Sequence, residues 1–265
     1  MKKALVTLFF ALLFYTIGMA ALHSQDVITT PTAKVYVLCF HSFWGNHPEY
    51  PYDFSREEFA AILDQFINAG FKFVTMDDIF AGTPIGTKNL LVTIDDGNRS
   101  VYDAFHQVLE PRGVKPLLAI IGGSIEAIPQ DLTWSQLEEL QSCGCYIAAH
   151  GWFHIMADDR LFVLSPELFD QELIKSRERI EKHLPSQPIV VYVYPYGKYI
   201  PQDNMEVPKY GYLLAFSLKR QPLYLPLIGS TQNHFNLPRY IFDQGGCQAL
   251  IDQILKDSLA PVAQR

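Results

Sequence analysis

Acidic and histidine residues stand at a few points of the sequence where they could hold a metal ion and move protons. Asp95 and Asp96 lie side by side after the apolar run 89–94, and three residues separate His150 from His154. A divalent cation bound by two imidazoles and one carboxylate, with positions left open for water, is a common catalytic arrangement. The two motifs together therefore predict a metal site that activates water.

The neighbouring aspartates could divide the work. Two carboxylates this close resist ionising together unless a cation compensates one of them. One can bind the metal while the other takes a proton from the bound water, since adjacent residues leaving a strand point in different directions. Taken alone, Asp95 and Asp96 could instead cap a helix, and the two histidines could make ordinary hydrogen bonds.

The segment "HGWFH" (150–154) suggests how both rings could reach one ion. Positions i and i+4 lie on the same face of a helix, so we expect His150 and His154 to share one helical turn.

Short β-branched or aromatic runs alternate with helical patterns along the chain, and these elements must position the motifs. We expect strands at 34–40, 71–75, 89–94, 115–121, 145–149, 189–194, 212–216 and 239–242. Capping boxes begin two of the helices, and we expect helices at 55–70, 99–113, 133–144, 165–184 and 248–259.

About seven alternations with continuous apolar strands favour an α/β fold, a single-domain (β/α) barrel, over a doubly wound sheet. In a parallel barrel the carboxyl ends of all strands open at one mouth. His41, Asp95 with Asp96, and His150 each follow a different strand, as does the turn Pro195–Gly197. We therefore expect these residues to face one another.

Composition sets the broad class. The chain has 265 residues, 49% hydrophobic and 18% charged, with a net charge of −7, so nothing suggests a nucleic-acid-binding protein. No glycine-rich phosphate loop follows the first strand. The cysteines are interpreted as small buried residues, with or without one disulfide, and they are Cys39, Cys143, Cys145 and Cys247.

The N-terminus has the pattern of a secretory signal peptide. Two lysines precede an apolar run over 4–17, and small residues follow it. We expect a signal peptide at 1–20, a linker at 21–33 and a catalytic domain at 34–260, with a retained N-terminal anchor as the alternative. The mature protein would then be exported, periplasmic or extracellular, without a stable membrane span.

With these residues identified, the sequence resembles the polysaccharide deacetylase family (carbohydrate esterase family 4). The matching motifs are "TIDDG" (93–97), "HGWFH" (150–154), "YPYG" (194–197) and "NLPRY" (236–240). Gly151 stands where the family more often has Ser or Thr. The early segment "CFHSF" (39–43) resembles the branch that trims exported biofilm polysaccharides.

The resemblance implies a distorted (β/α) barrel that removes acetyl groups from an N-acetylated polysaccharide with a metal-bound water. Asp96, His150 and His154 would be the metal ligands, and the metal would most often be Zn²⁺. Asp95 would be the general base. A backbone N–H near Tyr196, after Pro195, would stabilise the oxyanion.

Two departures from the family pattern leave roles open. The family has an Arg before its third-motif Pro, which is missing before Pro195; Arg239 could replace it, or could be a surface or structural residue. The family's late L-x-x-H motif, which supplies the acid, is also missing. His41 is the preferred acid or substrate-positioning group, His234 is the alternative, and a third possibility is that neither histidine has this role.

Aromatic residues on the expected loops could stack on sugar rings, and they are Trp44, Tyr50, Tyr52, Trp152 and Tyr196. The sequence leaves open an O-acetyl esterase or a peptidoglycan or chitin-oligomer deacetylase of the same fold. A carbohydrate-binding relative that has lost catalysis is the alternative from another class.

Overall fold

The structure is a computed structural model that describes residues 30–47, 49–156 and 158–262. The expected signal peptide (1–20) and most of the expected linker (21–33) lie outside these residues. The strands are β1 (Ala33–Phe40), β2 (Lys72–Phe73), β3 (Gly86–Ile94), β4 (Leu117–Ile120), β5 (Tyr146–Ala149), β6 (Val191–Val193), β7 (Leu214–Phe216), β8 (Leu223–Leu225) and β9 (Tyr240–Ile241). The α-helices are α2 (Arg56–Asn68), α3 (Met76–Ala81), α4 (Ser100–Ala104), α5 (Trp134–Ser142), α6 (Asp159–Leu164), α7 (Pro166–His183), α8 (Asp203–Lys209) and α9 (Cys247–Ser258).

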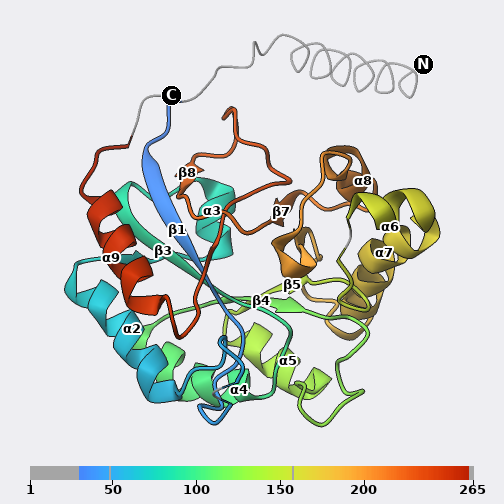
Figure 1. Ribbon diagram of the computed structural model, residues 1–265, viewed down its shortest axis with the longest axis horizontal. Coiled ribbons are helices and arrows are strands. Elements are labelled where there is room, and N and C mark those ends of the chain that lie inside the picture. The colour runs from blue at the N-terminus through green and yellow to red at the C-terminus, as the bar shows by residue number, and fades with distance from the viewer. Residues whose placement is uncertain (1–29, 48, 157, 263–265) are drawn as a thin grey trace, which may run out of the picture.

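The strands form one curled sheet in the order β7-β6-β5-β4-β3-β1-β8 (Figure 1). All neighbours are parallel except β1 and β8. The edge at β7 is joined back towards β1: the N–H groups of Ala215 and Ser217 donate to the carbonyls of His234 and Leu237, both at 2.8 Å. The same segment continues into β9, which pairs with β1 in parallel.

The sheet therefore closes into a distorted (β/α) barrel, which confirms the expected fold. A helix follows each of β1 to β6 and also β9, as the expected number of β/α units requires. The last helix, α9, lies beside α2 on the outside of the barrel (Figure 1), where Gln248 donates a hydrogen bond to Gln65 at 3.2 Å.

Alternation along the strands decides which side chains enter the barrel. In β1, Val35 and Val37 pack with inward residues of the other strands, whereas Tyr36 and Leu38 pack against the covering helices. This two-residue period is that of a strand with both faces buried. The same alternation along β3 places the side chain of Asp95 inside the barrel.

The expected helix at 99–113 is only partly α-helical. After α4 the chain forms a π-helical turn over Phe105–Leu109 and a 3₁₀ turn over Glu110–Arg112. Pro111 has no N–H to continue an α-helical ladder, which accounts for the change of winding before Gly113.

The four cysteines carry free thiols. Among the described residues, no helix is both long enough and apolar enough to cross a membrane.

Asp203, at the start of α8, gives a prediction on stability. Its side chain is fully buried; Oδ2 accepts the N–H of Ile200 at 2.7 Å, and no described residue forms a hydrogen bond with Oδ1. Burial raises the pKa of Asp203 to about 7. Because this exceeds the pKa in the unfolded chain, the folded state binds more protons between about pH 4 and 7 and its stability falls as pH rises.

We expect Asp203→Asn to gain stability relative to the wild type across that interval, by about 1–3 kcal/mol. Denaturant unfolding of both proteins at a series of pH values measures the difference. A difference that stays constant with pH would show that Asp203 does not titrate in this way.

Candidate active site

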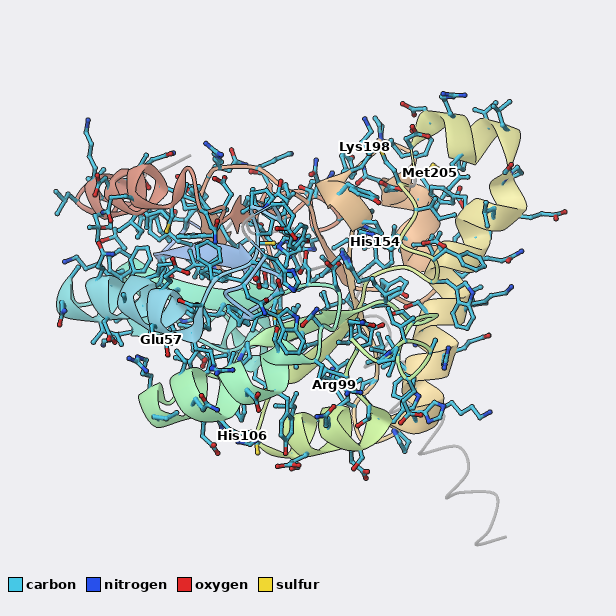
Figure 2. All side chains as sticks on the ribbon, turned by 60° about the horizontal axis from the view of Figure 1, so that its bottom comes forward. Glu57, Arg99, His106, His154, Lys198 and Met205 are labelled. Atoms are coloured by element: carbon cyan, nitrogen blue, oxygen red, sulfur yellow. The ribbon has the colours of Figure 1, made fainter. Side chains whose placement is uncertain are left out.

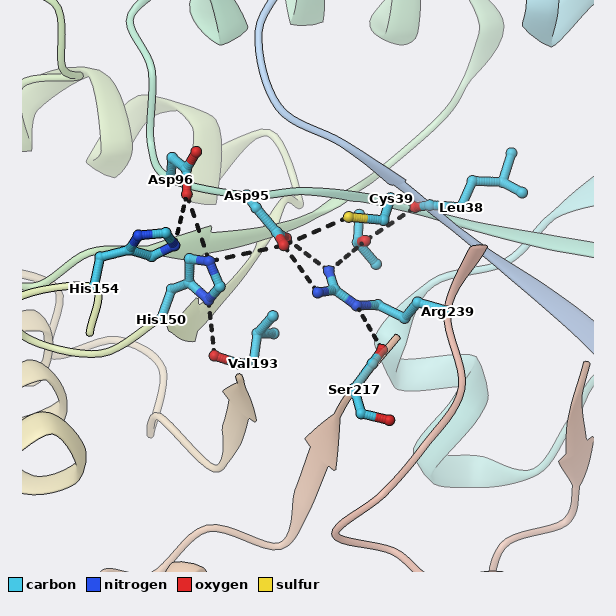
Figure 3. Close-up of polar contacts among 10 residues, drawn as sticks. Leu38, Cys39, Asp95, Asp96, His150, His154, Val193, Ser217 and Arg239 are labelled. Atoms are coloured by element: carbon cyan, nitrogen blue, oxygen red, sulfur yellow. Dashed lines mark hydrogen bonds and ion pairs between the residues drawn. The ribbon is translucent and has the colours of Figure 1, made fainter. Parts of the chain in front are cut away.

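A buried ion pair lies at the carboxyl end of β3. Both oxygens of Asp95 accept hydrogen bonds from Arg239, at 2.7 Å to Nη1 and 2.9 Å to Nη2 (Figure 3). Arg239 is 1% exposed, and it also donates to the hydroxyl of Thr93 and the carbonyl of Ser217. The interpretation of Arg239 as a surface residue is therefore wrong.

The ion pair fixes the charge of Asp95. Burial alone would raise the pKa of this carboxyl, but Arg239 and His150 outweigh burial and hold it well below its usual range. The thiol of Cys39 also approaches Oδ2, at 3.5 Å. Asp95 is thus an oriented carboxylate, ionised at neutral pH, beside the barrel mouth.

The next residue, Asp96, points to the mouth instead. Its backbone adopts a left-handed conformation, with φ of 74°. Asp96 Oδ1 lies 3.5 Å from Nε2 of His150 and 3.4 Å from Nε2 of His154 (Figure 3). The ligand-type atoms of these three residues all lie within 4.8 Å of one another.

The donor atoms of this cluster fit a divalent metal ion. Nδ1 of His150 lies 2.8 Å from the carbonyl of Val193, so Nδ1 carries the proton of the bond and Nε2 faces Asp96. Asp96 Oδ1 is buried and accepts no hydrogen bond. Donor atoms of a tetrahedral zinc site lie roughly 3.3 Å apart, which matches the separations from Asp96.

The electrostatics also favour a cation at this point. Burial opposes protonation of His150, but the carboxylates of Asp95 and Asp96 outweigh it and raise its pKa. Burial lowers the pKa of His154 to about 4, so that ring is neutral at neutral pH, as a metal ligand must be.

The two histidines reach this cluster from a loop, so the expectation of one helical turn is wrong. Gly151 and His154 both have left-handed backbones, with φ of 78° and 57°. A helix requires negative φ at every residue. The loop is held instead by Glu172 of α7, which accepts N–H groups from residues 152, 153 and 155.

The contact of Glu172 with this loop was not predicted from the sequence, although the position of Glu172 in its helix could have indicated it. It is a charged residue on the apolar stripe of α7, between Phe169 and Leu173, and all three are buried. A fully buried acidic residue must have partners, so a glutamate on a core-facing stripe indicates a structural or functional contact.

A cleft of about 440 Å³ opens beside Asp96 and His154, and it is lined by His41, Ser42, Trp44, His47, Glu49, Tyr50, Asp96, Asn98, Ile121, Ser124, Ile128, Gln130, Asp131 and His154. Nδ1 of His41 is buried and has no hydrogen-bond partner in the described part of the chain, and the ring centroid of His41 lies 5.0 Å from that of Tyr52. Burial lowers the pKa of His41. His234 does not line the cleft; its Nε2 lies 3.1 Å from the carbonyl of Leu227.

The turn Pro195–Gly197 approaches from β6. Tyr196 has φ of 58°, its side chain is 59% exposed, and its ring centroid lies 4.7 Å from that of His154. The N–H groups of Gly197 and Lys198 donate to the carbonyls of Tyr194 and Pro195 and so close the turn.

Of the aromatic residues expected to stack on sugar rings, Trp44 and Tyr50 line the cleft, whereas Trp152 does not. The guanidinium of Arg179 lies over its ring, 5.6 Å from the centroid, and Trp152 lines a separate cavity of about 310 Å³ near α7. Figure 2 shows His154 near the centre of the view and His106 towards the periphery.

Comparison with known proteins agrees with this geometry. The family model described as polysaccharide deacetylase matches residues 83–214. YxkH of Bacillus subtilis (strain 168), whose name assigns it to the polysaccharide deacetylases, is 26% identical over 197 residues, which are 72% of this chain and 67% of that protein.

Two solved structures resemble the fold. IcaB from Ammonifex degensii has a TM-score of 0.69 and 26% identity, over 84% of this chain and 97% of that one. The Streptococcus pyogenes deacetylase PplD, solved in complex with acetate, has a TM-score of 0.72 and 19% identity, over 85% of this chain and 99% of that one, and supports the fold alone. Together with the site described above, these similarities show that the chain belongs to the polysaccharide deacetylase family.

Proposed function

We propose that this protein is an exported, zinc-dependent hydrolase that removes acetyl groups from an N-acetylated polysaccharide. One observation carries the proposal: an ionised carboxylate, Asp95, lies beside three metal-type ligands at the mouth of a cleft, with His150 Nε2 3.8 Å from Asp95 Oδ2. A base next to a metal site is the arrangement that hydrolysis of an acetyl group requires.

Asp96, His150 and His154 would hold the ion, which supplies Lewis-acid polarisation of the acetyl carbonyl and of the attacking water. Asp95 would take the proton from that water. Arg239 keeps this carboxylate ionised and oriented, because it binds both oxygens and Asp95 cannot rotate without breaking two charged hydrogen bonds.

The remaining roles belong to residues around the cleft. His41, whose Nδ1 has no hydrogen-bond partner among the described residues, would donate a proton to the leaving nitrogen or position the substrate. In the turn after Pro195, the N–H of Tyr196 would stabilise the developing oxyanion, and the Tyr196 ring would cover the acetyl group at His154.

The cleft suits a neutral sugar chain. Its described lining has three carboxylates, no lysine and no arginine, and it presents the aromatic rings of Trp44 and Tyr50. Such walls repel uronates and phosphates, while aromatic faces pack on sugar rings. Export is proposed from the pattern of residues 1–20 and from the resemblance to enzymes of exported polysaccharides.

Acetate release tests the proposal. The purified protein is incubated with an N-acetylglucosamine polymer, a chitin oligomer, a peptidoglycan fragment and an O-acetylated xylan, before and after metal removal by 1,10-phenanthroline. We expect release from N-acetylated polymer, its loss after metal removal and its return with zinc. Undiminished activity in the metal-free protein would refute metal dependence, and preference for O-acetylated xylan would identify an O-acetyl esterase instead.

A further inference from the structure

Glu172 holds the loop that carries His154 with one buried carboxylate. Oε1 accepts the N–H of Phe153 at 2.8 Å, and Oε2 accepts those of Trp152 and Ile155 at 3.2 and 3.3 Å. Among the described residues, no lysine or arginine pairs with Glu172, which is fully buried. Its charge is therefore balanced chiefly by backbone N–H groups, as in the anion-binding turns of other proteins.

Gly151, which follows His150, allows Glu172 to contact the N–H groups of this loop. A Cβ atom at Gly151 would lie 2.5 Å from Oε2 of Glu172 and 3.2 Å from Pro195. With φ of 78°, the backbone also has a conformation that side chains disfavour. Gly151 thus leaves the space that the carboxylate of Glu172 occupies.

The position of His154 depends on this arrangement. His154 lies between Phe153 and Ile155. The N–H groups of both neighbours donate to Glu172, so Glu172 binds the backbone on both sides of His154. His154 itself has a left-handed backbone, a conformation that costs a non-glycine residue free energy unless its surroundings impose it. The contacts to Glu172, on both sides of His154, are placed where they can hold this conformation.

We propose that Glu172 is a positioning residue that sets the 151–155 loop before the metal binds, so that His154 already faces Asp96 and His150. This inference rests on the proposed function, because it takes His154 as a metal ligand. Groups that orient metal ligands typically change metal affinity by 10–100-fold when they are replaced.

The test measures zinc affinity of the metal-free protein, by competition with a chromophoric chelator. Glu172→Gln keeps the size of the side chain but puts an N–H donor against backbone donors. We expect zinc to bind about 10–100-fold more weakly. At saturating zinc, kcat should return close to the wild-type value, because Asp95 and Arg239 are untouched.

A matched control and a second variant complete the design. Glu178→Gln, on the exposed side of the same helix, should bind zinc as the wild type does. Gly151→Ala should also weaken zinc binding, and the double variant with Glu172→Gln should lose less than the sum, because both changes act on one contact.

Each outcome is decisive. Wild-type zinc affinity in Glu172→Gln, with the unfolding midpoint of the metal-free protein recorded beside it, would overturn the positioning role and leave the proposed function standing. Acetate release by the metal-free wild type would instead overturn the proposed function.

Discussion

Replacing Asp95 by Asn is expected to leave the metal bound and to lower the rate of acetate release by about 10²–10⁴-fold. The amide keeps the shape of the carboxyl and can still accept a hydrogen bond from Arg239, but it cannot take a proton from water. The proposed metal ligands are separate side chains, so metal content by atomic emission should match the wild type. Unchanged acetate release would show that Asp95 is not the base.

A control is needed because the change removes a buried charge. In Asp95→Asn the guanidinium of Arg239, 1% exposed, loses its anion, and breaking a buried pair in this way typically costs about 3–5 kcal/mol. The double variant Asp95→Asn/Arg239→Gln has no unpaired charge and should recover part of that stability. If the double variant is stable and still inactive, lost folding does not explain the lost rate.

His154→Ala is expected to lose the metal and, with it, acetate release. Asp96 and His150 would remain, but two ligands rarely hold a catalytic zinc ion. The loss of affinity should exceed the 10–100-fold typical of groups that only orient ligands. Metal content after dialysis, together with zinc titration of the metal-free variant, measures the effect.

His106→Ala is the matched control for this variant. His106 lies away from His154 (Figure 2) and contacts Glu110 and Glu139 on the outer helices. The His106→Ala variant should keep its metal and its activity. Full metal content in His154→Ala would exclude His154 from the ligand set, whatever the activity of the control.

Most of the barrel could be predicted from periodicity and helix signals. The capping boxes at Ser55 and Thr133 are present, and the long strands lie where apolar runs predict them. The short elements were not predicted. The helix α3, for example, begins with a capping box at Thr75 but has too few residues for a clear apolar period. The barrel closure through 234–239 depends on pairings between distant segments, which periodicity does not encode.

The candidate site likewise has features that the sequence predicts and features that it does not. The strand ends predict that Asp96, His150 and His154 meet, because parallel strands share one mouth. The winding of the 150–155 loop was missed, since the carboxylate that accepts its N–H groups belongs to Glu172, seventeen or more residues further along the chain. Arg239 could be suggested only by resemblance, because its partner is 144 residues away.

That distance has a consequence for the order in which the two partners of this ion pair are synthesised. The counter-ion of Asp95 comes from the segment before β9, among the last residues of the barrel to be synthesised. A nascent chain that ends before residue 239 has the aspartates and both histidines but leaves Asp95 without its guanidinium. The charge balance of Asp95 therefore depends on a residue that is synthesised after nearly all of the barrel.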